Sequence, residues 1–413
     1  MDKLSIFKNE EFVNTLKTFL SRILVFGIGL LFKIYLARTL SVEENGNFGK
    51  WLATYNYGII ALSFGLNLSL IYFVETKRIS KTDGFSVNFL FYLFLIPILF
   101  GISIVSDDTL FFLSVSSAIV IGLWISTLNS VQLILKRISR FNLTELLRNV
   151  FVFISIFIYL NIVNKYELVG LYFGYVIGLL LSFIIFFSLE KELKVIKFDA
   201  IKKVDFEYFQ YGSKGLVLNI LGQALYIFDI YIVDYLVGAK FLGLYVVAGS
   251  IARLLWFFVD AAGTIIFPRL IQGRGTEDSK IIVYRLSSIS FFFNIMGVIL
   301  FYFLGEFLIE ISFGQDYVPA YDTILILLFA SQGMVFYKLV NRYLVSVDQW
   351  KISYISVTIA VLVNLALNFA LVPSYNILGS AFASLIAYWV CGLLIAKLSG
   401  FDIKRLLITT SYK

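Results

Sequence analysis

Apolar stretches long enough to cross a membrane make up most of this sequence. A helix of about 20 mostly apolar residues spans a bilayer. Of the 413 residues, 60% are hydrophobic, and the mean hydropathy is +0.89. This composition excludes a soluble globular protein and predicts an all-α polytopic membrane protein. We predict about twelve transmembrane helices, at residues 16–37, 50–72, 85–105, 110–135, 146–163, 168–189, 208–236, 240–267, 285–304, 323–345, 351–372 and 377–397.

The basic residues are distributed unevenly between the predicted loops. Most of the 34 Lys and Arg lie at the two ends of the chain or in the loops after even-numbered spans. Loops after odd-numbered spans carry only Arg38, Lys50, Lys165 and Lys240. Cytoplasmic loops of membrane proteins carry the excess of Lys and Arg. We therefore predict that both termini are cytoplasmic.

Several classes of site are excluded by composition. The chain has no His and one Cys (Cys391), which argues against a metal site built from these ligands, a Ser-His-Asp triad and a disulfide. It has no Walker A pattern for a nucleotide. Its basic residues lie in short loops, where they indicate topology and not binding of nucleic acid. We expect no metal and no cofactor.

The two halves of the chain resemble each other. Ala37–Leu40 and Gly46–Phe48 follow the first span, as Val233–Leu236 and Gly243–Tyr245 follow the seventh, with one gap needed in the alignment. Residues 163–170 before the sixth span align without a gap to residues 372–379 before the twelfth. We predict a parallel internal repeat, with a six-helix lobe at 1–189, a cytoplasmic linker at 190–207 and a second six-helix lobe at 208–413. Parallel repeats place a substrate path between two lobes.

Three basic residues lie inside or at the ends of apolar spans and are predicted to bind an anionic substrate. An arginine at mid-helix costs about 2.5–3.5 kcal/mol on insertion scales. Arg22 and Lys33 fall on one face of the first span, and Arg253 lies in the eighth. We expect an aqueous cavity or an anion to offset this cost. Extension of the side chain to the membrane interface remains an alternative for Arg22 and Lys33.

Two carboxylates in the second half are predicted to couple transport to an ion gradient. Protonation or ion binding removes the cost of burying Asp229 and Asp260. Asp260 shares a helix face with Arg253 but lies about 10.5 Å along the axis, so each needs another partner. A structural hydrogen bond is the alternative role for Asp229. Lys338 and Arg342 are predicted to extend to the cytoplasmic interface.

Four short motifs, in order, carry a resemblance to a known family. They are ARTL with NGNF after the first span, GLY at 243–245, FPRL at 267–270, and LVP with NILGSAFA before the last span. Together they resemble Wzx-type O-antigen and polysaccharide flippases of the multidrug/oligosaccharidyl-lipid/polysaccharide (MOP) exporter superfamily, which includes MATE transporters and MurJ.

The resemblance implies a transport protein and not an enzyme. It implies a MATE/MurJ-like fold in the bacterial inner membrane and alternating access. The implied activity is movement of an undecaprenyl-pyrophosphate-linked oligosaccharide from the cytoplasmic to the periplasmic leaflet. The implied partners are that glycan, the lipid bilayer and a polysaccharide polymerase of the same pathway.

Two further functions remain open at this point. A MATE-like antiporter of organic cations should present carboxylates, and we identify none within the predicted spans of the first half. A membrane-embedded polysaccharide polymerase would be expected to carry a large external loop with catalytic residues, whereas the predicted external loops are short. Export of the cell-wall lipid precursor is closer to the leading prediction.

Overall fold

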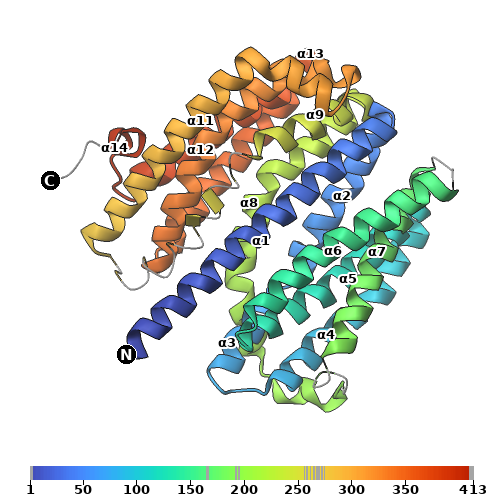
Figure 1. The fold of residues 1–413 in the computed structure, drawn as a ribbon, viewed down its shortest axis with the longest axis vertical. Helices are drawn as coiled ribbons and strands as arrows, with labels where there is room; N and C mark the ends of the chain where they lie inside the picture. The colour runs from blue at the N-terminus through green and yellow to red at the C-terminus, as the bar shows by residue number, and fades with distance from the viewer. Residues whose placement is uncertain are drawn as a thin grey trace. The chain divides into compact units, whose positions relative to one another are not determined.

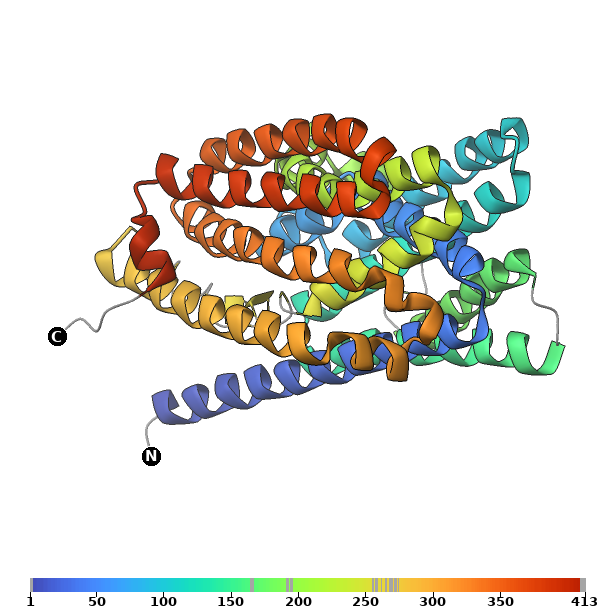
Figure 2. The ribbon, with the colours of Figure 1, turned by 90° about the horizontal axis from the view of Figure 1, so that it is seen from above.

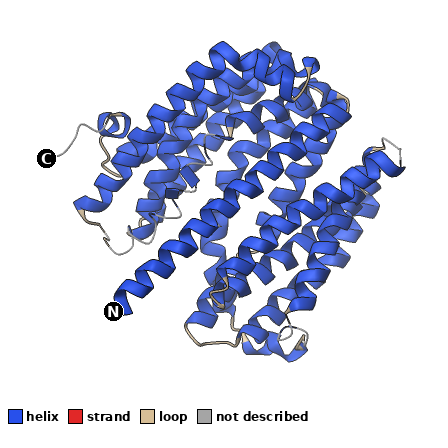
Figure 3. Ribbon diagram, viewed as in Figure 1, coloured by secondary structure: helices blue, strands red, loops and turns tan. Residues whose placement is uncertain are grey.

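The part of the chain that the structure describes is helical throughout. The computed structural model describes residues 3–163, 167–190, 193, 196–254, 256, 259, 260, 262, 263, 266, 270, 273 and 275–408, without the side chains of 3–19, 22, 163 and 214. None of these residues forms a strand (Figure 3). The predicted all-α class is therefore confirmed.

Long helices follow one another along the chain (Figure 1). In order they are α1 (Lys3–Thr39), α2 (Val42–Leu62), α3 (Leu66–Glu75), α4 (Lys81–Val105), α5 (Thr109–Ile134), α6 (Ile138–Ile158), the π-helix η1 (Tyr159–Val163), α7 (Leu168–Leu189), the 3-10 helix η3 (Phe198–Lys203), α8 (Phe206–Val237), α9 (Ala239–Ala252), α11 (Glu277–Ser312), the 3-10 helix η4 (Gln315–Ala320), α12 (Tyr321–Ser346), α13 (Trp350–Leu398) and α14 (Ile403–Leu407).

Eight helices in the described chain are long and apolar enough to cross a membrane, or nine if α2 and α3 form one broken span. Helix α13 contains two of the predicted spans. Asn376, with φ 50° and ψ −132°, interrupts it. Figure 2 shows the two limbs of α13 lying side by side. A multi-pass membrane protein is confirmed, and the count of twelve stays a prediction.

The second predicted span, 50–72, is broken. Helices α2 and α3 are bent by 41° relative to each other. Phe64 and Gly65 at the break have φ values of 49° and 69°, in the left-handed region that ends a helix. Gly65 also lies against the backbone of Gly212 in α8, where a β-carbon would be 2.0 Å from the Gly212 carbonyl oxygen. A side chain at position 65 is therefore excluded by packing.

The chain forms two compact units, which divide it at other places than the predicted lobes. Unit 1 comprises Met1–Lys33 and Lys50–Ile220, and unit 2 comprises Ile34–Gly49 and Leu221–Lys413. The end of α1 and the start of α2 thus belong to the second unit. Similarity between the halves of the sequence does not indicate this exchange. The predicted lobe boundaries at 189 and 208 stay a prediction.

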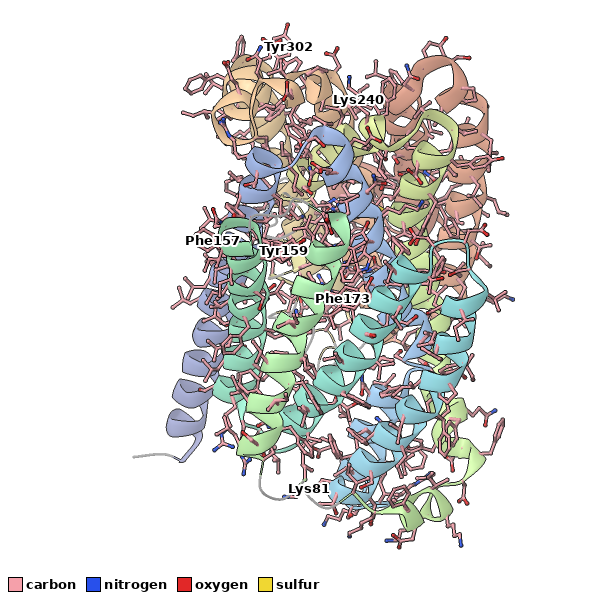
Figure 4. All side chains as sticks on the ribbon, turned by 90° about the vertical axis from the view of Figure 1, so that its right-hand side faces the viewer. Lys81, Phe157, Tyr159, Phe173, Lys240 and Tyr302 are labelled. Carbon is pink, nitrogen blue, oxygen red and sulfur yellow. The ribbon has the colours of Figure 1, made fainter. Side chains whose placement is uncertain are left out.

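Unit 1 is a set of antiparallel helices. Helix α5 packs against α4 and α7, and α6 packs against α7. Tyr159 packs closely against α7: its ring occupies the space that a β-carbon at Gly170 would fill, and Phe173 follows Gly170 by about one turn (Figure 4). Gly170 is one of the positions that recur in the predicted repeat.

Unit 2 repeats this packing order. Helix α12 packs against α11 and α13, as α5 packs against α4 and α7 in unit 1. Equivalent helices also begin in the same way. Ser80 caps α4 by accepting a hydrogen bond from the Asp83 amide at 3.1 Å, and Thr276 caps α11 by accepting one from the Ser279 amide at 3.3 Å. These matches support the parallel repeat.

Two glycines from the repeated motifs pack against each other inside unit 2. A β-carbon on Gly46 would lie 2.1 Å from the carbonyl oxygen of Ala239, four residues before Gly243. A β-carbon on Gly243 would lie 1.9 Å from the carbonyl oxygen of Val42, four residues before Gly46. Each motif therefore makes the same contact with the other, as expected for two copies related by an approximate two-fold axis.

The segment predicted as a linker is tied down by ion pairs within unit 1. The Lys203 Nζ atom of η3 lies 3.1 Å from Asp83 Oδ1 at the start of α4. Glu190, at the end of α7, pairs with Arg137 at 3.1 Å and Arg140 at 2.8 Å. The described part of residues 190–207 is thus a short folded connection.

We expect labelling of introduced cysteines to establish the membrane orientation. Gln315→Cys, in an exposed turn of η4, should react with an impermeant thiol reagent added outside intact cells, and Lys202→Cys should react only after lysis. The native Cys391 is buried and serves as the unlabelled background. The reverse pattern would contradict cytoplasmic termini.

We expect the glycine contact to be required for stability. Gly46→Ala and Gly243→Ala should each lower the thermal unfolding temperature in detergent, since overpacking typically costs about 1–3 kcal/mol. Gly222→Ala is the matched control, because a β-carbon there meets no atom within 4 Å. Equal unfolding temperatures for all three variants would contradict the close approach of the two motifs.

Candidate functional site

A pocket lies inside unit 2, where α8, α9, α12 and the second limb of α13 meet. Its polar lining includes Asp229, Arg253 and Ser331, and its aromatic lining includes Trp256 and Tyr388. Two residues predicted from the sequence to act in transport, one anionic and one cationic, therefore face the same pocket. The aromatic rings form one wall: Trp256 lies 4.9 Å from Tyr226 and 6.0 Å from Tyr388, measured between ring centroids.

Asp229 is the deepest of the charged groups at this pocket. It is 1% exposed and accepts hydrogen bonds from α9 and from both limbs of α13. Tyr245 on α9 donates to Oδ2 at 2.7 Å, and Asn368 on α13 donates to Oδ1 at 2.8 Å. Ser384, on the second limb of α13, also donates to Oδ2. Donors of this kind stabilise a buried carboxylate.

The surroundings of Asp229 contain more polar atoms than its hydrogen bonds use. Within the described chain, the oxygen atoms of Asn364 and Asn368 are buried without a hydrogen-bond partner, while the Asn364 side chain also lies within hydrogen-bonding reach of Asp229 and the Ser380 hydroxyl within reach of Tyr245. Asn364 precedes Asn368 by one turn, and Ser380 precedes Ser384 by one turn. Buried polar atoms are normally paired, so this cluster requires an explanation such as an ordered water or a cation. Hard cations bind oxygen ligands of this type.

Arg253 lies directly after α9, at the edge of the pocket. Its backbone amide donates to the Gly249 carbonyl at 3.2 Å, which closes the last turn of the helix. Its side chain is half-buried and lines the pocket beside Gly249. The sequence placed this arginine in the middle of a continuous span, whereas the described helix ends at Ala252.

Asp260 has partners on another helix, as its distance from Arg253 required. Lys338 Nζ lies 2.6 Å from Asp260 Oδ2, and Arg342 Nη2 lies 3.2 Å from Asp260 Oδ1. Lys338 and Arg342 therefore have a partner within unit 2, which the sequence analysis did not predict, and their extension to the membrane interface stays a prediction. The pairing joins α12 to the segment after α9.

The two basic residues predicted on the first span belong to unit 1. Lys33 is half-buried on α1, at the end of the N-terminal segment of that unit. The side chain of Arg22 lies outside the described residues, although its backbone is part of α1. Most of the FPRL motif also lies outside them. The predicted substrate-binding roles of Arg22 and Lys33 stay predictions.

An ion pair in unit 1 was missed by the sequence analysis. Glu145 pairs with Arg148 at 2.9 Å and accepts a hydrogen bond from Asn129. The predicted span began at residue 146, but α6 begins at Ile138, so the helix contains both charges. The statement that the first half has no carboxylate within a span is therefore wrong. The spacing of three residues between opposite charges was the available signal.

Comparison with known proteins identifies a family and a fold. A family model described as "Polysaccharide biosynthesis protein" matches residues 13–274, more than half of the chain. A solved structure of the lipid II flippase MurJ, in an inward closed conformation, is 19% identical with a TM-score of 0.77 and covers 96% of this chain and 89% of that chain. A search of curated proteins gives no match.

Transporters of the MATE type share the fold as well. An inward-facing multidrug resistance MATE family transporter of the MOP superfamily is 13% identical with a TM-score of 0.71, covering 97% of this chain and 99% of that one. A MOP superfamily transporter from Pyrococcus furiosus, described as having a binding pocket of reverse polarity, is 10% identical with a TM-score of 0.65 and 96% coverage of both chains. These identities establish the fold alone, and the predicted MATE/MurJ-like fold is confirmed.

Proposed function

Because the chain belongs to the polysaccharide biosynthesis protein family, we propose that it is a flippase for a lipid-linked oligosaccharide. The substrate we propose is an undecaprenyl-pyrophosphate-linked repeat unit, of the O-antigen type or a related polysaccharide, moved from the cytoplasmic to the periplasmic leaflet. The observation that carries the proposal is a half-buried arginine, Arg253, facing a pocket among helices of a membrane protein.

The chemistry of the pocket favours an anion attached to a sugar. A guanidinium binds phosphate oxygens through paired, charge-assisted hydrogen bonds. Tyr226, Trp256 and Tyr388 offer aromatic faces with polar edges beside Arg253. We assign Arg253 to the pyrophosphate, with Arg22 and Lys33 of unit 1 as further phosphate-binding groups. The isoprenoid tail would stay in lipid while the glycan crosses the membrane by alternating access.

We assign ion coupling to Asp229 in preference to Asp260. Asp229 lies beside two buried neutral oxygen atoms, those of Asn364 and Asn368, which are distant in the chain and have no hydrogen-bond partner among the described residues. Together with the carboxylate, these atoms fit the ligand set of a sodium ion. A sodium gradient across the membrane would supply the energy for net movement. Asp260 was predicted for the same role, but two cations already contact it, and they oppose the binding of a third.

The organic-cation antiporter is the runner-up. Such a site needs a carboxylate with open oxygen atoms. Asp229 faces the pocket, but it is 1% exposed and three donors already bind its oxygens, which leaves room for a small ion and not for a bulky organic cation. Glu145 in unit 1 is paired with Arg148. The accessible charge at the pocket is the arginine. This favours an anionic substrate over a cationic one. We propose a transporter and not a polymerase, and we place a polymerase of the same pathway downstream of this protein as a partner.

We expect substitution of Arg253 to abolish glycan export without preventing membrane insertion. Arg253→Ala should eliminate surface polysaccharide in a flippase-deficient strain that makes the matching glycan, and Arg253→Lys should restore part of it, because lysine keeps the charge but not the paired hydrogen bonds. Lys240→Ala, an exposed basic residue of the same unit, is the control. Full export by Arg253→Ala at the native protein level would contradict the assignment.

We expect sodium to stabilise the protein through Asp229. Replacing choline chloride with sodium chloride should raise the unfolding temperature of the purified wild type, because a ligand that binds only the folded state adds stability. Asp229→Asn should lose this response, and so should the milder Asn364→Leu. Asp234→Asn removes the same charge from the same helix and should keep the stabilisation by sodium. An equal sodium response in all four proteins would exclude a cation site at Asp229.

A further inference from the structure

Two cations on α12 converge on one carboxylate. Lys338 and Arg342 lie one turn apart on the same helix face, and both contact Asp260, at 2.6 Å and 3.2 Å. The group of three carries one net positive charge. A balanced ion pair would need only one of the two cations, so the second adds to the cost of placing charge within an apolar helix.

The position of each cation is fixed by groups other than Asp260. The Arg342 guanidinium donates to the Val259 carbonyl at 2.9 Å. It occupies the space beside Gly263, where a β-carbon would overlap its Nη1 atom. Lys338 Nζ lies 4.9 Å from the centroid of the Trp256 ring, within the range of a cation–π interaction. The two cations are therefore held at positions where an anion of suitable size can contact both.

The carboxylate is the most accessible member of the group. The side chain of Asp260 is 42% exposed, against 19% for Lys338 and 22% for Arg342. An exposed acid over two more deeply seated cations can be displaced by an incoming anion without moving the cations. A phosphate also offers more acceptor oxygens than a carboxylate and can contact both cations at once.

The cation pair is next to the pocket, because Trp256 contacts both. Trp256 lines the pocket with Arg253, and the Lys338 ammonium group lies over the ring of Trp256. Its indole N–H donates to the Ser331 carbonyl at 3.3 Å, which holds the ring against α12. Trp256 therefore borders both the pocket that Arg253 lines and the Lys338–Arg342 pair.

We propose that Lys338 and Arg342 form a second phosphate-binding position, and that Asp260 occupies it as an internal counter-ion until a phosphate of a lipid-linked substrate displaces it. The proposal rests on the proposed function, because it assigns this position to the substrate that also contacts Arg253. Asp260 is then a competitor of the substrate. The same chemistry would suit a phospholipid headgroup, which the experiment separates from a pyrophosphate carrier.

The test is a comparison of lipid affinities for the full-length protein in detergent, measured by native mass spectrometry. The probes are undecaprenyl pyrophosphate and phosphatidylglycerol. For undecaprenyl pyrophosphate, the double variant Lys338→Met/Arg342→Gln should bind about tenfold more weakly. Asp260→Asn should bind more tightly than the wild type, because the amide no longer competes. Lys240→Met, which also removes one positive charge from unit 2, should bind like the wild type.

The direction of the Asp260→Asn effect separates this proposal from a purely structural ion pair. Unchanged or weaker binding in a folded Asp260→Asn variant would overturn the proposal, and so would normal binding by the double variant. Thermal unfolding verifies folding, and Lys338→Gln is a milder second variant that leaves Arg342 paired with Asp260. If the substitutions changed the affinity for phosphatidylglycerol as much as the affinity for undecaprenyl pyrophosphate, the assignment of this position to the carrier lipid would be overturned.

Failure of this proposal is distinguishable from failure of the proposed function. If Arg253→Ala loses pyrophosphate binding while the double variant keeps it, the second position is excluded and the flippase proposal stands. If the wild type binds no undecaprenyl pyrophosphate, the proposed substrate itself is wrong. Tighter binding by Asp260→Asn together with weaker binding by the double variant supports both.

Discussion

The structure depends on how charge is neutralised inside apolar helices. Three carboxylates, Asp229, Asp260 and Glu145, have donors among nearby side chains. Asp229 is surrounded by a phenol, an amide and a hydroxyl, Asp260 by two cations, and Glu145 by Arg148 and Asn129. The cost of an unpaired charge in such a setting is several kcal/mol, so these contacts fix which helices lie together. The three environments also differ in chemistry, and the differences suggest separate roles.

The internal repeat explains the framework on which these groups are placed. Gly46 and Gly243 allow the two copies of one motif to approach at backbone distance, and each meets the carbonyl oxygen four residues before the other. Small residues permit close helix contacts in membranes, where burial of apolar surface gives little driving force between helices. The contact lies wholly in unit 2, because residues 34–49 belong to that unit. A duplicated sequence has thus given two units that are not divided at the duplication boundary.

Sequence patterns predicted the bounds of the helices better than the contacts between side chains of different helices. The apolar runs for α5, α7 and α12 agree with the observed helices to within two residues, because hydropathy depends on composition alone. The burial of Asp229 was predictable from its depth in a span. The partners of Asp260 were not, because Lys338 and Arg342 lie far away in the chain and near a helix end, where basic residues usually extend to the interface. Glu145 was missed because the start of α6 was placed too late, and the break at Phe64 and Gly65 depends on packing against Gly212.

The most direct test is translocation in liposomes that contain only the purified protein. A fluorescent oligosaccharide on undecaprenyl pyrophosphate is placed in one leaflet, and its appearance in the other leaflet is followed with and without an imposed sodium gradient. The flippase account predicts that the protein accelerates exchange of this lipid and that the gradient biases its direction, while the same oligosaccharide on a neutral lipid does not move. Equal movement of the charged and neutral lipids, or no acceleration of either, would contradict it.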